Sequence, residues 1–431
     1  MRQEHNPRIL LIAATTGYQT RMFGDAVRRQ GAELVFATDR CHQLEDPWSD
    51  DAIAVRFNDE SGSVRAIVDA TVEIPIHGVV AVGDRPAVIG ALAANAIGVP
   101  GHPPEAARVA SNKLMTRQCL ANAGLPGPWF KLVTPNVSAK EVAHQVTYPC
   151  VVKPLALAAS RGVIRANTPM ELESACGRLR RLLQDPDIRA LGDLANEAVL
   201  IEEYIPGAEY ALEGLVTNGK FSALAVFEKP EPLEGPFFEE SIYVTPPRRA
   251  ESDVARLVKQ VAIAIEAIGL TQGPVHAECR LTDDKVVVLE VAARPIGGLC
   301  SKVLRFTGPD GMLTLEDLLV KHALSQSVVD HRLASGAAAV MMIPVPSAGV
   351  FKSVEGVAAA RRQPLIEDVI ITAKQDQCFV PWPEGASYPG FIFARGDAPS
   401  TVVDAVHAAH RALEFKMDTV IPIGLVNQVS H

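Results

Sequence analysis

The sequence predicts a protein of mixed α/β and α+β class, with a Rossmann-like N-terminal domain, a larger central domain and a small α+β cap. Three observations support this. The apolar run RILLIAA at 8–14 precedes a helical pattern and a second apolar run, ELVFATD at 33–39, which is the order of a parallel βαβ unit. Residues 273–298 hold two alternating runs joined at Asp283-Asp284, as in a strand hairpin. Beyond about 335, strand-like runs precede one helix, Thr401–Phe415.

Composition sets limits on the class of protein. The 431 residues allow two or three domains, and 48% hydrophobic with 21% charged residues is typical of a folded protein with a sizeable core. A net charge of −9 argues against a nucleic-acid partner. Seven cysteines without C-x-x-C spacing indicate free buried thiols in a reducing cytosol rather than a zinc site. The apolar run Ile9–Ala14 is too short for a signal peptide, and no run approaches the ~20 residues of a membrane helix. We therefore expect a cytoplasmic protein without a membrane partner.

The N-terminal domain is predicted to have a structural role. A helix over Thr20–Gln30 ends at Gly31, and a second unit has a strand at 78–82 and a helix at Pro86–Ala96. The G-x-G-x-x-G fingerprint is missing, so dinucleotide binding is not expected. The strand ends are instead expected to face a cleft shared with the next domain. The Gly/Pro-rich segment 98–104 marks the first boundary, and a second is expected near 326–335, which gives domains at 1–104, 105–325 and 326–431.

Two lysines are candidates for binding an anion. Lys113 lies in a predicted amphipathic helix over 105–125, where a lone lysine is usually a solvated residue. Lys153 lies inside an apolar strand, where an unpaired ammonium is costly, so we expect it to meet an anion. In the following loop, residues 159–162 offer backbone N–H groups and a hydroxyl, which suit a phosphate-binding turn. A Walker loop is absent.

The segment 198–216 reads as a strand, a Pro-Gly break and a second strand. The break is expected to expose backbone groups of Glu202–Ile205 to which an adenine ring can bind, and Glu209 can accept hydrogen bonds from a ribose. Taken alone, the segment is also an ordinary hairpin sequence.

The hairpin at 273–298 carries the candidate metal ligands. Glu278 and Glu290 lie on neighbouring strands, where two carboxylates can hold a hard divalent cation. They face each other only if the hairpin has an odd loop, 283–285, or a bulge, because a two-residue turn would put them on opposite faces. His276 shares the face of Glu278 and is predicted to contact substrate, with a neutral core histidine as the alternative.

Arg294 and the pair Gly297-Gly298 follow the second strand. The arginine fork suits a developing oxyanion, and glycine lets backbone N–H groups approach the same charge. The alternatives are a structural salt bridge for the arginine and an ordinary turn for the glycines.

The order of these motifs resembles the ATP-grasp superfamily of carboxylate–amine ligases over about residues 8–325. Within it, EVAARPIGG at 290–298, HAE at 276–278 and FEESIYVTPP at 238–247 are most similar to the L-amino acid ligases, which join two amino acids into a dipeptide. Ala292 stands where the superfamily more often has asparagine, a replacement familiar in the amino acid ligases. The loop at 155–162 is poorer in glycine than the pattern.

The resemblance implies an ATP-grasp fold whose lid covers about 126–206, and a ligase that activates a carboxylate with ATP and joins it to an amine. It implies two Mg²⁺ ions, with Mn²⁺ as a substitute, at Glu278 and Glu290. It places Arg294, Gly297 and Gly298 at the reaction centre and His276 and Glu240 on substrate. The residues implied for ATP are Lys113, Lys153, Ser160, Arg161, Gly162, Val163, Glu202, Glu203, Tyr204, Ile205 and Glu209.

The expected partners are a small carboxylate and a small amine, most simply two amino acids. A homodimer is left open. One alternative is another carboxylate-activating ligase or a carboxylase, which would keep the ATP site and differ around 236–247 and 296–300. A further alternative is a nucleotide-binding regulator without activity. Retention of the phosphoryl-transfer residues argues against it.

Overall fold

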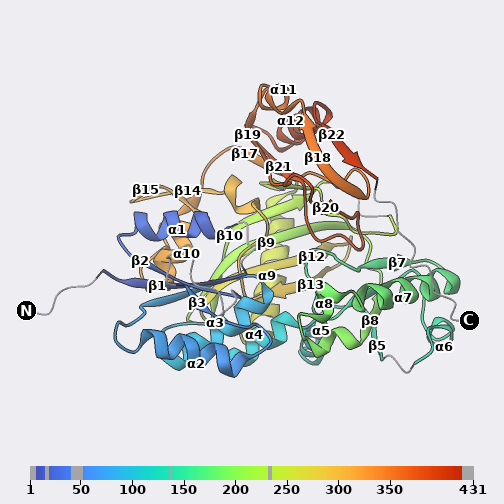
Figure 1. Cartoon of the computed structure of the whole chain (residues 1–431), viewed down its shortest axis with the longest axis horizontal. Helices are drawn as coiled ribbons and strands as arrows, with labels where there is room; N and C mark the ends of the chain where they lie inside the picture. The colour runs from blue at the N-terminus through green and yellow to red at the C-terminus, as the bar shows by residue number, and fades with distance from the viewer. Residues whose placement is uncertain (1–5, 15–18, 40–51, 135–136, 232–234, 420–431) are drawn as a thin grey trace, which may run out of the picture.

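The computed structural model describes residues 6–14, 19–39, 52–134, 137–231 and 235–419. The described N-terminal residues form a parallel sheet in the order β3-β2-β1-β4, flanked by helices on both faces (Figure 1). The predicted turn at 15–17 lies outside the described residues. The elements are β1 (Arg8–Ala13), α1 (Thr20–Arg29), β2 (Glu33–Thr38), β3 (Ile53–Ala54), α2 (Glu60–Thr71), β4 (Gly78–Val82) and α3 (Asp84–Ile97).

The predicted helix over 105–125 is wrong in one respect, because it is broken into α4 (Pro104–Ser111) and α5 (Lys113–Asn122). Asn112 between them is extended, with φ −124° and ψ 115°, and its side chain accepts hydrogen bonds from the backbone N–H groups of Leu114 and Met115. This N-cap starts a new helix and makes Lys113 its first residue.

A separate antiparallel sheet has the order β5-β8-β6-β7 and belongs to the part of the chain that was expected to be a lid, which we call the lid below. It has its own hydrophobic core, which the helix α7 (Pro169–Leu183) covers. β8 belongs to this sheet whereas β9 belongs to the central one, so the Pro-Gly break joins two sheets and not a hairpin. The other lid elements are β5 (Phe130–Val133), α6 (Ala139–Ala143), β6 (Cys150–Pro154), β7 (Ile164–Ala166), α8 (Pro186–Arg189), η1 (Leu194–Glu197) and β8 (Val199–Glu203).

The central sheet has the order β13-β12-β9-β10-β11-β17-β21-β19. It continues without a break across the boundary predicted near 326–335, because β11 pairs with β17 of the C-terminal part. Helix α9 (Glu251–Ile268) covers one face and ends at Gly269, whose φ of 85° is left-handed. The strands are β9 (Ala208–Thr217), β10 (Lys220–Lys229), β11 (Ile242–Thr245), β12 (Gly273–Leu281), β13 (Val286–Ala292), β17 (Ala337–Met342), β19 (Ile366–Ile371) and β21 (Gly390–Gly396).

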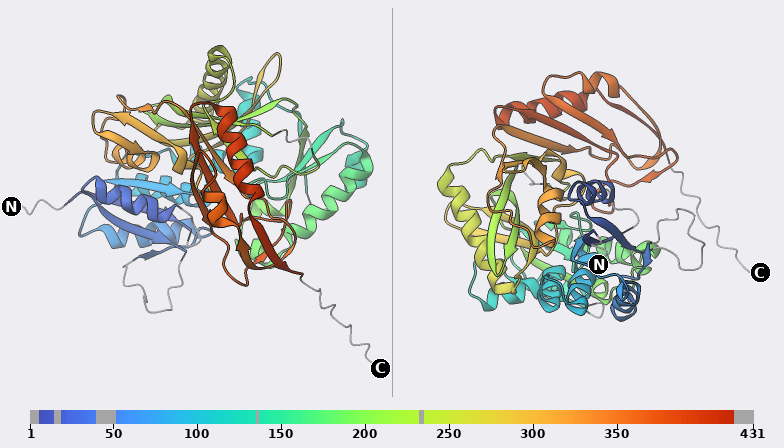
Figure 2. Two further views of the ribbon diagram at one scale, coloured as in Figure 1. Left: turned by 90° about the horizontal axis from the view of Figure 1, so that it is seen from above. Right: turned by 90° about the vertical axis from the view of Figure 1, so that its left-hand side faces the viewer.

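The cap rests on the central sheet and lies opposite the N-terminal domain (Figure 2). The predicted helix at Thr401–Phe415 is observed as α12 (Pro399–Arg411), and it is followed by a strand that was not predicted. The remaining elements of the cap are β18 (Gly349–Glu355), α11 (Val357–Arg361), β20 (Cys378–Phe379) and β22 (Glu414–Asp418). Between β13 and β17 along the chain come η2 (Cys300–Val303), β14 (Arg305–Gly308), β15 (Gly311–Thr314), α10 (Leu315–Ala323) and β16 (Arg332–Leu333).

One hydrophobic core joins three parts of the molecule. It contains Phe23 of α1, Phe227 of β10 and Phe391 of β21, so the N-terminal domain, the central sheet and the cap pack on each other. Among the described residues, no helix has both the length and the apolar character needed to cross a membrane.

Candidate active site

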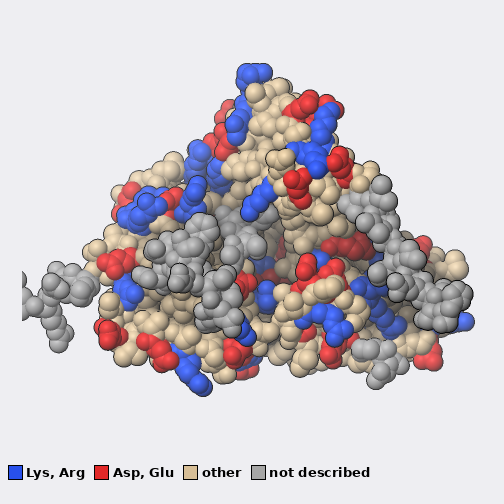
Figure 3. Space-filling model, in the orientation of Figure 1, with Lys and Arg blue, Asp and Glu red and all other residues tan. Residues whose placement is uncertain are grey.

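A cavity of about 480 Å³ lies where the lid, the central sheet, the N-terminal domain and the cap meet. Figure 3 shows a hollow between the cap and the lid, with charged side chains of both signs around it. The ends of β1 and β4 reach the cavity through Ala14 and Val82, so the N-terminal strand ends face a shared cleft as expected. Every predicted site residue except Arg161 and Gly162 lines this cavity.

The two predicted metal ligands face each other across β12 and β13. Glu278 pairs with Glu290, whereas Cys279 pairs with Val288, so Leu289 is an extra residue in β13. The turn itself has four residues, because Leu281 pairs with Val286. The bulge, and not an odd loop, therefore puts both carboxylates on one face.

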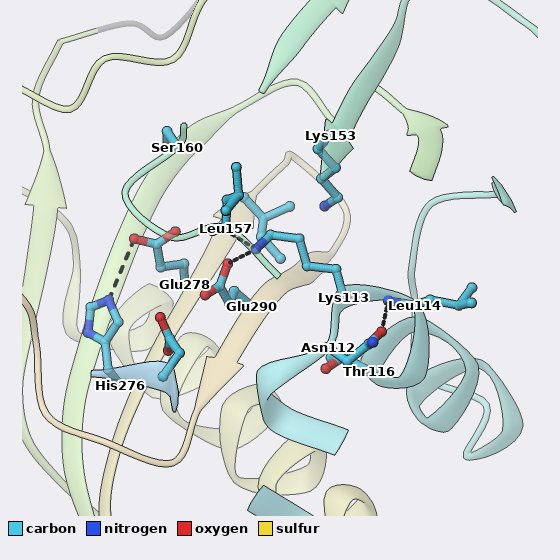
Figure 4. Close-up of polar contacts among 12 residues, drawn as sticks. Asn112, Lys113, Leu114, Thr116, Lys153, Leu157, Ser160, His276, Glu278 and Glu290 are labelled. Carbon is cyan, nitrogen blue, oxygen red and sulfur yellow. Dashed lines mark hydrogen bonds and ion pairs between the residues drawn. The ribbon is translucent and has the colours of Figure 1, made fainter. Parts of the chain in front are cut away.

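The chemistry of this pair fits a hard divalent cation. Burial opposes ionisation of Glu278, but Lys229 and His276 hold the pKa of this carboxyl well below its usual value, so it is a carboxylate. Glu290 lies 3.6 Å from the ammonium of Lys113 (Figure 4). Two carboxylates on one face supply the oxygen ligands that Mg²⁺ prefers.

Lys229 was not predicted, and it links three acids. Its Nζ lies 2.7 Å from Glu209, 2.9 Å from Glu240 and 2.9 Å from Glu278. Burial lowers the pKa of Lys229, but the three carboxylates more than compensate and keep it charged. The signal was available, because Lys229 follows an apolar run and precedes a proline, as Lys153 does.

Lys153 finds its expected anion in the protein itself. Its ammonium forms a buried ion pair with Glu202, to which Arg117 also donates from 2.9 Å. Burial lowers the pKa of Lys153 to about 8 although Glu202 raises it. Lys113 donates to the Leu157 carbonyl at 2.8 Å, so it is directed to the loop at 155–162 and is not a solvated residue (Figure 4).

The segment Glu202–Ile205 is less open than predicted. The N–H groups of Glu203 and Tyr204 already donate to the carbonyls of Trp129 and Pro149, at 3.0 and 3.2 Å. Within the described part of the chain, the Ile205 N–H has no hydrogen-bond partner, and it is the donor left for an adenine ring. The side chain of Glu202 is directed to Lys153 and Arg117 and not to a base.

Glu209, predicted to bind ribose, uses both carboxylate oxygens within the protein. One oxygen accepts from Lys229 at 2.7 Å and the other from Arg280 at 2.9 Å. Glu203, which is half-buried at the cavity, makes no side-chain contact among the described residues. It is therefore the more available acid near the Pro-Gly break.

Arg294 is anchored by a residue that was not predicted, Asp84 at the start of α3. Two hydrogen bonds of 2.6 and 3.2 Å join the guanidinium to the carboxylate. Burial opposes both charges, but each partner favours the charged form of the other, so the pKa of Arg294 is raised and that of Asp84 is lowered. The salt bridge considered as an alternative is present, and Arg294 lines the cavity at the same time.

The loop that follows Arg294 is held through Ile296. Its carbonyl accepts from Gln19 at 2.6 Å, and its N–H donates to Glu213 at 3.0 Å. Gly298 has a left-handed φ of 62°, which strongly favours glycine. Both Gly297 and Gly298 are thereby fixed at the cavity wall.

The contacts and the raised pKa of His276 favour the charged form over the neutral core histidine considered as the alternative. Its Nδ1 contacts Glu213, and its Nε2 lies 3.6 Å from Glu278 (Figure 4). Burial lowers the pKa, but Glu213 and Glu278 raise it to about 9. A positive imidazolium therefore stands beside the acid pair.

Arg161 and Gly162 are the two predicted phosphate contacts that lie elsewhere. The Gly162 N–H donates to the Pro383 carbonyl at 2.7 Å, and Arg161 donates to the Glu384 carbonyl at 2.9 Å. These groups fix the loop to the cap, a contact that could not be foreseen from local sequence. Ser160 stays at the cavity, 3.3 Å from Glu240.

Comparison with known proteins identifies the parts of the chain. Residues 146–303 match the ATP-grasp domain, and residues 341–418 match the L-amino acid ligase C-terminal domain 2. The structure is similar to that of an L-amino acid ligase from Bacillus licheniformis, with a TM-score of 0.81 and 25% identity over 96% of this chain and 99% of that one. The predicted fold and the predicted resemblance are both confirmed.

Curated relatives match a shorter stretch. An alanine–anticapsin ligase of Bacillus subtilis is 25% identical over 244 residues, which is 53% of this chain and 51% of the relative. An uncharacterized protein of Sinorhizobium fredii is 28% identical over 214 residues, 49% of this chain and 41% of the relative. The chain thus spans about half or less of the length of these relatives.

Proposed function

We propose that this member of the ATP-grasp carboxylate–amine ligases joins two amino acids, or close relatives of them, into a dipeptide-like amide with release of ADP and phosphate. The observation that carries the proposal is the register of Glu278 against Glu290 beside Arg294, in a cavity that Lys113 of α5 and Lys153 of the lid also line. The match of residues 341–418 to an L-amino acid ligase domain favours amino acids as substrates.

A carboxylate does not react directly with an amine, because oxide is a poor leaving group. The carboxylate must therefore be activated first. Transfer of the γ-phosphoryl group of ATP to a substrate carboxylate gives an acyl phosphate, and the amine of the second substrate displaces the phosphate. Two Mg²⁺ ions held by Glu278 and Glu290, with Mn²⁺ as a substitute, would neutralise phosphate charge. Lys113 and Lys153 would hold phosphate oxygens as point charges.

The residues around the hairpin would stabilise the charge that develops in the reaction. Arg294, held by Asp84, offers its remaining N–H groups to an oxyanion, and the backbone at Gly297 and Gly298 approaches the same position. The imidazolium of His276 adds positive charge on the same face as Glu278. Because each group is already oriented by a buried partner, little reorganisation is needed during the reaction.

The nucleotide and an amino group would occupy different walls of the cavity. Ile205 supplies a free N–H for adenine, and the nearby acids Glu203 and Glu209 are the candidates for ribose. Glu240 is buried between Lys229 and Tyr243, and it is our candidate for the α-ammonium of a substrate.

The test measures ADP and phosphate release with pooled amino acids, and identifies products by mass spectrometry. We expect release that depends on an amino acid pair and a product mass equal to the pair minus one water. The Glu290→Gln variant should lose at least about 100-fold in kcat. Glu105→Gln is the control because this carboxylate on α4 is 84% exposed. ADP release that needs bicarbonate instead of an amino acid pair would contradict the proposal.

A further inference from the structure

Two residues of the lid loop at 155–162 have an unfavourable backbone conformation. Ala159 and Ser160 have φ angles of 55° and 54°, in the left-handed region, where residues other than glycine are uncommon. The Arg161 N–H donates to the Ala158 carbonyl at 3.2 Å, which closes a turn around them. A turn with positive φ at both central residues usually contains Asn-Gly or Gly-Gly, because a Cβ atom is strained there. A contact from outside the turn is therefore needed to stabilise it.

The cap loop 382–384 holds this turn through hydrogen bonds. The indole Nε1–H of Trp382 donates to the Ala159 carbonyl at 2.9 Å. The carbonyls of the other two cap residues accept from the Gly162 N–H at 2.7 Å and from the Arg161 side chain at 2.9 Å. The indole contact joins residues 223 positions apart, so it forms only when the cap folds against the lid.

Trp382 is itself fixed by its surroundings. The residue is 5% exposed and belongs to the core that the N-terminal domain, the central sheet and the cap share. Its ring stacks on that of Tyr388, with the centroids 4.7 Å apart and an interplanar angle of 28°. The lid, in contrast, has a core of its own. The indole N–H therefore reaches the lid loop from a rigid, closely packed part of the molecule.

The conformation of the turn matters because the turn lies at the cavity. Ala158, Ala159 and Ser160 all line the cavity, as does Lys153. Among the described residues, the backbone N–H groups of Ala159 and Ser160 have no hydrogen-bond partner. Consecutive N–H groups in a turn conformation form a concave site for an anion. A turn that relaxed to negative φ angles would lose this arrangement.

We propose that Trp382 is a positioning residue for the phosphates of ATP, which acts through the turn at 158–161. Its indole N–H and the two carbonyls that follow it hold the turn in the left-handed conformation. The cap thus contributes to triphosphate binding although Trp382 does not itself line the cavity. The adenine end of the site, at Ile205, does not depend on this contact. The inference rests on the proposed function only in placing ATP in the cavity.

The first test measures binding of two ligands by calorimetric titration, namely a non-hydrolysable ATP analogue with Mg²⁺, and adenosine. We expect Trp382→Phe, which removes the indole N–H, to raise the Kd for the analogue about fivefold to tenfold. The Kd for adenosine should stay within about twofold, because adenosine has no phosphate. A general loss of structure would weaken both ligands. Equal weakening of both, or no weakening of the analogue, would overturn the proposal.

The second test asks whether glycine in the turn can replace the contact. Glycine adopts a positive φ readily, so the turn of Ala159→Gly should keep its shape with less help from the cap. In that background, Trp382→Phe should raise the Kd for the analogue by no more than about twofold. Ala158→Gly is the matched control, because Ala158 is also exposed but has no positive φ, and it should leave the full effect of Trp382→Phe. A full effect in both backgrounds would show that Trp382 does not act through the turn.

A further control accounts for the place of Trp382 in the core. Its substitution is expected to lower the melting temperature, as is Phe351→Leu, because Phe351 belongs to the same core and is also 5% exposed. The Phe351 ring packs on Phe379 and Phe415 of the cap. Phe351→Leu should therefore melt lower and keep the Kd for the analogue. A Kd raised equally by both substitutions would assign the effect to core packing and overturn the proposal.

A second variant keeps the test open if Trp382→Phe does not fold. Arg161→Ala removes a neighbouring contact with the cap loop and leaves the core intact. It should also weaken the analogue more than adenosine, and Ala159→Gly should reduce this effect. Wild-type affinity of Arg161→Ala for both ligands would contradict the proposal.

These titrations separate the inference from the proposed function because they need no turnover. If the wild type forms no amide from any pair, the proposed function fails, and binding of the analogue still tests Trp382. If the wild type forms an amide and Trp382→Phe binds the analogue as tightly as the wild type does, only the inference on Trp382 fails.

Discussion

Arg294 and Asp84 form a largely buried pair between two domains, 210 residues apart in the chain. Removing one charge of a buried pair leaves the other unpaired and costs about 3–5 kcal/mol. We expect Asp84→Asn to lower stability by about 3 kcal/mol, to let Arg294 shift, and to lower kcat by about 10-fold to 100-fold with little change in the KM for ATP. Denaturant unfolding measures the change in stability, and steady-state kinetics measure kcat and the KM for ATP.

The matched control for this variant is Asp25→Asn. Asp25 pairs with Arg28 on the surface, where the two side chains are 44% and 76% exposed, so its removal should leave both stability and kcat nearly unchanged. If Asp84→Asn keeps full kcat, Arg294 does not depend on this pair for its position.

Lys153 gives the site a pH dependence. Burial is the largest effect on its pKa, which lies at about 8, so the ammonium is charged below pH 8 and loses its proton above it. Phosphate affinity should fall with that proton, and we expect the KM for ATP to rise by up to about tenfold between pH 7 and pH 9. Lys153→Arg keeps its charge throughout this range, so its KM should stay flat. A wild-type KM that is independent of pH would show that another group controls ATP binding.

At the scale of single residues, the sequence predicted a role where the neighbouring residues in the chain were enough to indicate it. Lys153 was found because a lysine inside an apolar strand requires an anion. Asp84, Gln19 and Trp382 were missed because each becomes meaningful only when a distant segment of the chain folds against it. Lys229 was missed although the same local argument applied to it.

At the scale of elements, counting residues between Glu278 and Glu290 showed what their facing each other requires. The count could not show which of the two possible features, an odd loop or a bulge, provides it. The sequence required an odd loop or a bulge, and the structure has the bulge at Leu289. Arg117 of α5 donates to the Leu289 carbonyl at 2.7 Å and also binds Glu202 at the end of the lid strand β8. The same side chain therefore ties the bulge to the lid, which no local pattern could reveal.

The loop at 155–162, predicted to bind phosphate, is a second element that depends on a distant partner. Gly162 has a φ of 76°, and a Cβ atom there would lie 2.8 Å from Leu179 of α7. We expect Gly162→Ala to push the loop away from Pro383 and to raise the KM for ATP severalfold. Gly31→Ala is the control, because its φ of 64° carries a similar backbone cost of about 1 kcal/mol with nothing within 4 Å. Equal KM values in the two variants would mean that the loop tolerates the displacement.

For the whole molecule, the sequence predicted the parts but not how they join. The predicted boundary near 326–335 falls inside a continuous sheet, because β11 and β17 pair across it. The lid is different, since its sheet and core are its own. Contacts between the lid and the cap, such as that of Arg178 with Glu384, involve residues 206 positions apart and cannot be read from periodicity.

Because the lid has its own core, we expect the lid and the rest of the chain to unfold with different free energies. The N-terminal domain, central sheet and cap share a core, so they should open together, whereas the lid should open at a lower free energy. In hydrogen exchange read by mass spectrometry, amides of β6 and β8 should exchange faster than those of β9 and β12. Addition of ATP with Mg²⁺ should slow exchange mainly in the lid, because the proposed nucleotide site lies between the two units.

Arg178→Ala sharpens this test. Its contact with Glu384, 2.7 Å from Nη2 to a carboxylate oxygen, joins lid helix α7 to the cap, and both side chains are partly exposed. Its loss should cost no more than about 1 kcal/mol, which is up to about fivefold faster lid exchange with the central strands unchanged. If lid and central amides exchange through the same opening in the wild type, the lid is not an independent unit. The cap contact would then belong to a single cooperative fold.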